Sequence, residues 1–121
     1  MTLHHVSESI DDLMRHIRTH PIKVLSATTV VFGVSERVLV DRDRHKTVHL
    51  ARMACCLVLR RHGFSYPEIG RTLMRDHTTI MNSVRMAEKT EQTDEQFRSQ
   101  VQLVERLLRP KHLKLRVEVN D

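Results

Sequence analysis

Five consecutive polar side chains, Arg75-Asp76-His77-Thr78-Thr79, form the part of the sequence best suited to hydrogen bonding with another molecule. A carboxylate can accept a hydrogen bond from cytosine N4, an imidazole or hydroxyl can donate one to a purine N7, and a threonine methyl can pack on a thymine methyl. Each good contact of this kind discriminates between bases by about 1–3 kcal/mol. Arg75 is placed for a phosphate or a guanine. This polar run, residues 75–79, is therefore our candidate for a site that reads base edges.

The residues before the polar run predict a short helix. Ser65 is a good N-cap, and Glu68 three residues later can complete a capping box. Pro67 lies near the first helical position, where a proline loses no hydrogen bond. Ile69 and Leu73 are one turn apart, so they share one face of the helix.

A second helix follows at once and begins within the polar run. Asp76 is a suitable N-cap, and an apolar face at helical spacing should point to the core: Ile80, Val84 and Ala87. Another face at the same spacing carries only polar or basic residues: Thr78, Asn82, Arg85 and Lys89. A short helix, a tight turn and a second helix with one apolar and one polar face are what a helix-turn-helix DNA reader requires.

Composition favours duplex DNA as the partner. The 121 residues allow one domain with a modest core, and a net charge of +5 with a pI near 9.8 favours a polyanion. Only 3% of the residues are aromatic, whereas proteins that bind single strands usually stack bases on several rings. We therefore expect double-stranded DNA rather than a single strand.

No metal, cofactor or membrane segment is expected. Cys55 and Cys56 are adjacent in an apolar run, which suits neither a disulfide framework nor a zinc site, and the histidines match no metal-binding motif. The sequence shows no signal peptide and no apolar stretch of membrane-spanning length. We expect a cytoplasmic, nucleoid-associated protein that is not an enzyme.

The whole chain predicts an all-α fold in three parts. An N-terminal helix occupies residues 1–21, a helix-turn-helix domain occupies residues 22–109, and an extended tail or strand occupies residues 110–121. Further helices of the domain are expected at residues 22–32, 35–39, 47–62 and 94–109. Residues 22–32 are rich in β-branched side chains, but no second central strand is present to pair with them, and Gly33 offers a helix stop.

Two segments outside the domain are candidates for protein contacts. The tail alternates apolar and polar residues, a strand pattern with no partner strand in a helical domain. It is therefore disordered, packed as an extended arm, or paired with another chain. The N-terminal helix is amphipathic and is the other candidate, so a protein partner or a homodimer through either segment stays open.

Basic side chains gather in the loop before the longest helix and at the end of that helix. Arg42, Arg44 and Lys46 lie in the loop DRDRHK, and Arg60 and Arg61 follow fourteen residues later. These cations are candidates for contacts to the DNA backbone or the minor groove. Arg60 and Arg61 are equally typical of solvated charges at a helix C-terminus, where the helix dipole favours cations.

The segment around the polar run resembles a known family. Pro67-Glu68-Ile69-Gly70, then Leu73, then Arg75-Asp76-His77-Thr78-Thr79-Ile80 is similar to the signature of the C-terminal DNA-binding domain of DnaA, the bacterial chromosomal replication initiator. The similarity in pattern extends from about residue 24 to residue 108. It implies a helical bundle of the DnaA domain IV or Trp-repressor-like type.

The resemblance also implies roles for individual residues. In that family the Asp-His-Thr-Thr run opens the recognition helix in the major groove, while an arginine of the basic loop enters the minor groove. The major-groove residues implied here are Arg75, Asp76, His77, Thr78, Thr79 and Asn82. The backbone or minor-groove residues implied here are Arg42, Arg44, Lys46, Arg60, Arg61, Ser65, Tyr66, Pro67 and Arg85.

Two departures from the family pattern bear on these expectations. Family members usually have glycine between the two helices, where this chain has Met74, so we expect a tighter or differently closed turn. Asp41 and Asp43 interrupt the basic loop. Fewer neutralised phosphates would lower both the affinity for DNA and its dependence on salt.

Catalysis is not expected from this chain. The initiator's ATPase requires a glycine-rich phosphate loop, whereas Gly33, Gly63 and Gly70 are far apart. A hydrolase is also disfavoured, because triad residues converge from different elements and the polar run is contiguous. We therefore expect a DnaA-like protein without the ATPase domain that binds specific duplex sequences and regulates replication or transcription. The alternative is an adaptor that keeps the fold and binds a replication or regulatory protein.

Overall fold

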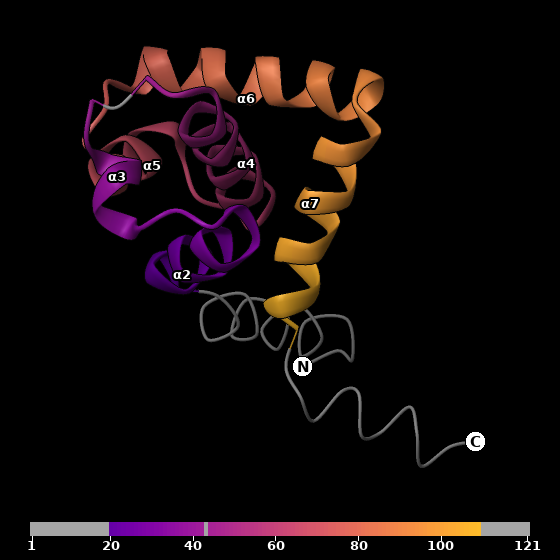
Figure 1. Ribbon diagram of the computed structural model, residues 1–121. Helices are drawn as coiled ribbons and strands as arrows, with labels where there is room; N and C mark the ends of the chain where they lie inside the picture. Colours follow the sequence, from indigo (N-terminus) through magenta and orange to yellow (C-terminus); the bar gives the residue numbers. More distant parts are fainter. Residues whose placement is uncertain (1–19, 43, 110–121) are drawn as a thin grey trace, which may run out of the picture.

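Six helices make up the part of the chain that this computed structural model describes, residues 20–42 and 44–109 (Figure 1). No strand occurs within that part, which confirms the predicted all-α fold. The helices are α2 (Pro21–Phe32), α3 (Glu36–Val40), α4 (Lys46–Arg61), α5 (Tyr66–Leu73), α6 (His77–Thr93) and α7 (Glu95–Leu107). The predictions for residues 1–19, Asp43 and the tail fall outside the described residues. Among the described helices, none is long and apolar enough to cross a membrane.

Local capping explains where the helices begin and end. Ser65 and Glu68 form the predicted capping box: Ser65 Oγ accepts from the Glu68 N–H at 3.2 Å, and Glu68 Oε1 accepts from the Ser65 N–H at 2.9 Å. Gly33 ends α2 in the left-handed conformation with a φ of 67°. Asp94 caps α7 by accepting from the Phe97 N–H at 3.1 Å. These signals are local in the sequence, so the helix boundaries agree closely with the predicted ones.

The central helix is α4, which is buried along most of its length. It packs against α2, α3, α5, α6 and α7, and Figure 1 shows these helices arranged around it. Its buried side chains are Val48, Ala51, Met53, Ala54, Cys55, Cys56, Leu57, Val58 and Leu59. Burial raises the pKa of Cys56 to about 12 and also raises the pKa of Cys55. Both thiols are therefore protonated at neutral pH and act as core side chains.

The last two helices close the bundle over α4. In Figure 1, α6 lies across the top and α7 descends along one side. The predicted apolar face of α6 is buried and consists of Ile80, Val84 and Ala87. From α7, Phe97 enters the core, where its ring centroid lies 6.4 Å from that of Phe32 in α2. With its apolar face buried, α6 turns its polar face outward.

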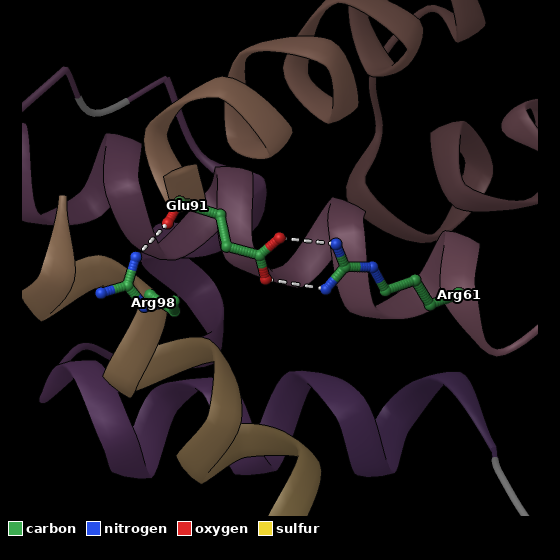
Figure 2. A network of polar contacts seen from close by, with 3 residues as sticks. All are labelled: Arg61, Glu91 and Arg98. Carbon is green, nitrogen blue, oxygen red and sulfur yellow. Dashed lines mark hydrogen bonds and ion pairs between the residues drawn. The ribbon is translucent and has the colours of Figure 1, made fainter. Parts of the chain in front are cut away.

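An ion pair joins the C-terminal end of α4 to α6. Both terminal nitrogens of Arg61 bind the Glu91 carboxylate, at 2.8 and 2.7 Å, and Arg98 of α7 donates to the Glu91 carbonyl at 3.1 Å (Figure 2). The hydrogen bonds from Arg61 lower the pKa of Glu91, and the same bonds raise the pKa of Arg61. Because the Arg61 side chain is 43% exposed, the pair contributes about 1 kcal/mol or less.

The corner between α5 and α6 closes through Met74. This residue has a φ of 55° and is the single non-glycine residue with a positive φ among the described residues. The N–H groups of Met74 and Arg75 both donate to the Gly70 carbonyl, as in helix ends that glycine usually closes. A Cβ on Gly70 itself would lie 2.5 Å from the Arg75 carbonyl oxygen, so the close approach requires glycine there. Methionine therefore takes the left-handed conformation at this corner, and the expectation that the turn is tighter or differently closed than in the family stays a prediction.

Met74→Gly should raise the free energy of unfolding by about 0.5–1 kcal/mol. A non-glycine residue is destabilised by about 1–2 kcal/mol in the left-handed region, and glycine removes that strain. The larger conformational entropy of glycine in the unfolded state offsets about 0.5–1 kcal/mol of the stabilisation. Urea unfolding followed by circular dichroism measures the difference. Met74→Ala keeps the strained backbone and is the control, for which no gain is expected. A glycine variant less stable than the wild type would show that the corner is not strained.

Candidate nucleic-acid interface

The start of α6 exposes residues 76–79 of the polar run to solvent. Asp76 is the N-cap, and its Oδ1 accepts from the Thr78 N–H at 2.7 Å. That backbone hydrogen bond lowers the pKa of the Asp76 carboxyl, so the group is ionised at neutral pH and acts as an acceptor. The side chains of His77 and Asp76 are 58% and 68% exposed. Both are therefore available to a molecule that approaches this end of α6.

The polar face predicted for α6 continues from this end along the helix. Thr78, Asn82, Arg85 and Lys89 are all exposed. The Asn82 amide oxygen accepts from the Arg85 guanidinium at 3.5 Å, a long contact between adjacent turns. The face presents hydroxyl, amide and cationic groups in one row, as the sequence predicted.

Arg75 does not project from the corner; its guanidinium binds backbone carbonyls. Its Nη1 donates to the carbonyls of Val40 and Leu73, each at 3.0 Å, and its Nη2 donates to the carbonyl of Asp41. The first and last of these acceptors lie more than thirty residues away in the sequence, at the end of α3. Arg75 therefore holds the end of α3 against the helix-turn-helix corner.

Arg52 of α4 binds carbonyls of the same stretch. It donates from Nε to the Leu39 carbonyl at 2.9 Å and from Nη2 to the carbonyls of Val38 and Asp41, at 3.2 and 3.0 Å. Carbonyls at a helix C-terminus lack partners within the helix, and the planar guanidinium supplies several donors at once. We name Arg52 and Arg75, with the carbonyls of residues 38–41, the arginine clamp. Sequence reasoning missed Arg52, because a single cation among the core residues of α4 gives no local sign of its acceptors.

A cleft of about 650 Å³ lies where the basic loop meets the corner. The residues that line it are Arg42, Arg44, His49, Arg52, Met74, Arg75 and Asp76. Arg42, Arg44, Arg75 and Asp76 were predicted as site residues, and the fold brings them together here. His49 and Met74 were not predicted; His49 lies one turn before Arg52 on α4, so the two face the same loop.

The remaining predicted cations are divided between two places. Lys46 is exposed in the first turn of α4, beside the basic loop. Arg60 lies at the opposite end of α4, with its guanidinium carbon 4.5 Å from the ring centroid of Tyr66, close to the N-terminus of α5. Arg61 is bound to Glu91, which follows His77 by fourteen residues, about 21 Å along α6. The structure therefore keeps Arg61 away from the exposed start of α6.

Two consecutive helices joined by a sharp corner, the second with an exposed polar face and an exposed N-terminus, define a helix-turn-helix DNA-binding protein. A sequence profile of the family described as "Bacterial dnaA protein helix-turn-helix" matches residues 21–86. The match covers more than half of the chain, which therefore belongs to this family. The matched segment includes α2 to α5 and the first half of α6. The matched domain is a DNA-binding domain and not a catalytic one.

Individual relatives agree with the family match. The chain is 31% identical over 81 residues to Chromosomal replication initiator protein DnaA 1 of Chlamydia muridarum, with 65% of this chain and 18% of the relative covered. It is 39% identical over 83 residues to the DnaA of Thermomicrobium roseum, covering 67% and 18%. It is 36% identical over 101 residues to the DnaA of Cereibacter sphaeroides, covering 83% and 20%. The chain thus spans about a fifth of the length of these relatives.

Arg75→Ala should lower the free energy of unfolding by about 1–3 kcal/mol, because partly buried carbonyls of α3 and α5 would lose a charged donor. Arg71→Ala on the exposed side of α5 is the matched control and should change it by less than about 0.5 kcal/mol. Urea unfolding of both variants is the measurement. Equal stability of the two variants would show that the hydrogen bonds of Arg75 contribute nothing to the free energy of unfolding.

Proposed function

We propose that this chain binds duplex DNA in a sequence-specific manner, with the N-terminal half of α6 in the major groove and the basic loop against the adjacent backbone or minor groove. The observation that carries the proposal is the exposed, capped start of α6, where Asp76, His77 and Thr78 present an acceptor, an imidazole and a hydroxyl. The major groove is wide enough for an α-helix and offers matching donors and acceptors.

The polar run supports specific contacts to bases. The ionised Asp76 carboxylate can accept from a cytosine N4 with the oxygen that does not cap the helix. His77 and Thr78 can donate to a purine N7, and the Thr79 methyl can pack against a thymine methyl. Asn82, one turn further along α6, is suited to the edge of an adenine. These are the residues to which we assign sequence preference.

Cations on either side of the corner support binding to the DNA backbone. Arg42 and Arg44 line the cleft at the basic loop, and Lys46 is exposed beside it. Arg85 is exposed on the polar face of α6, and Arg60 lies over Tyr66 near the start of α5. We assign phosphate or minor-groove contacts to these residues, together with Ser65 and Pro67 at the N-terminus of α5.

The geometry changes the roles of two predicted residues. Arg75 already binds the carbonyls of the arginine clamp, so we assign it to positioning the basic loop relative to α6. Arg61 is paired with Glu91, and we assign it to holding α4 and α6 together. Neither assignment requires these guanidiniums to contact DNA.

We further propose that the protein regulates replication or transcription from the nucleoid and that these residues do not hydrolyse nucleotide. The three glycines support the last point: Gly33 ends a helix, Gly63 lies in the turn after α4, and Gly70 packs under the corner. None of them lies in a glycine-rich loop of the kind that cradles phosphates.

Fluorescence anisotropy with labelled 20-base-pair duplexes tests the proposal. The comparison is between the duplex that the wild type prefers within a panel and a duplex pool of random sequence. His77→Ala and Thr78→Ala should each reduce the preference by roughly 5- to 150-fold and leave binding to the random pool nearly unchanged. Arg42→Ala and Arg44→Ala should weaken binding to both duplexes alike and reduce the salt slope by about 1 each.

Two results would contradict the proposal. Equal effects of both sets of variants on both duplexes would remove sequence reading from α6. No binding to any duplex at about 50 mM salt would reject DNA binding by this chain and favour the adaptor, because phosphate contacts are strongest at low salt.

A further inference from the structure

Met74 combines two unfavourable features at one position. Its backbone has a φ of 55°, a conformation that L residues with side chains rarely adopt, and its side chain is 75% exposed although it is apolar. Glycine would avoid both, since it has no Cβ strain and no apolar surface. The fold gains nothing visible from the methionine: the closing hydrogen bonds to Gly70 come from backbone N–H groups.

The surroundings of Met74 indicate what its side chain meets. It lines the cleft at the basic loop together with Arg42, Arg44 and His49, and with Arg52 and Arg75 of the arginine clamp. Asp76, the residue that opens the exposed face of α6, lines the same cleft. A thioether among several guanidiniums suits an occupant that carries negative charge and apolar surface within a few ångströms of each other.

A deoxynucleotide unit of a DNA strand has this combination. Its phosphate matches the arginines, and its deoxyribose carbons, or a thymine methyl, offer apolar surface close by. The cleft is continuous with the start of α6, so a strand that borders the major groove there would pass over Met74. An acidic peptide would match the charge as well, but the exposed polar residues that open α6 beside the cleft are suited to base edges and favour a DNA strand.

We propose that the Met74 side chain packs against the apolar surface of one nucleotide, a deoxyribose or a thymine methyl, on the strand whose phosphate lies against Arg42 or Arg44. The inference rests on the proposed binding of duplex DNA and adds an apolar contact residue at the corner. Met74 lowers folding stability and raises DNA affinity, so replacement by glycine should raise the stability and lower the affinity.

Met74→Gly, Met74→Ala and Met74→Leu test the inference through two measurements on the full chain. The glycine variant should melt at a higher temperature than the wild type and bind the preferred duplex about three- to tenfold more weakly. The alanine variant should bind as weakly as glycine without the gain in melting temperature. The leucine variant keeps apolar surface and should bind within about twofold of the wild type. Val30→Ala is the control, because Val30 is 72% exposed on α2 and does not line the cleft; its affinity should be unchanged.

Deoxyuridine placed at one thymidine position of the duplex at a time distinguishes the two apolar sources. If Met74 contacts a thymine methyl, loss of that methyl at one position weakens the wild type and leaves Met74→Gly unaffected. If Met74 contacts a sugar, each position affects the two proteins equally, including a position whose methyl packs on Thr79. If Met74→Gly and the wild type bind the preferred duplex with equal affinity, the inference is overturned and the proposed function is left intact. A wild-type protein that binds no duplex would overturn both.

Discussion

Burial of α4 is the constraint that positions the cleft at one end of this helix and the Arg61–Glu91 ion pair at the other. Its buried residues extend from the first turn to Leu59, and every other described helix packs against it. Because α6 places Ile80, Val84 and Ala87 on this core, the opposite face of α6 must point to solvent. One end of α4 carries the basic loop and the cleft, and the other end carries the ion pair with α6. The exposed polar run and the structural ion pair are therefore separated by the length of the bundle.

Basic residues of the same type serve different purposes in this chain. Arg52 and Arg75 bind the carbonyls of residues 38–41, and Arg61 and Arg98 bind Glu91. Arg42 and Arg44 line the open cleft instead. Four arginines are thus bound within the fold, and the arginine clamp holds the end of α3, which leads into the loop with Arg42 and Arg44, against the corner before α6.

The features that the sequence predicted well are those with local physical causes. Ser65, Asp76, Asp94 and Gly33 cap helices through contacts within a few residues, so pattern and propensity were enough to place the elements. The exposed face of α6 followed from helical spacing for the same reason. The family match over residues 21–86 confirms the resemblance that the polar run carried.

The features that the sequence could not predict depend on long-range contacts or on strain. Arg75 meets Val40 across 35 positions, and Arg61 meets Glu91 across 30, so neither partner could be read from spacing. The left-handed conformation of Met74 goes against its intrinsic preference and is imposed by the corner. Selection of bound duplexes from a random pool tests most directly whether α6 reads base sequence, as we propose. We expect enrichment of a short common motif that His77→Ala relaxes; a bound fraction with the composition of the starting pool would contradict sequence reading by α6.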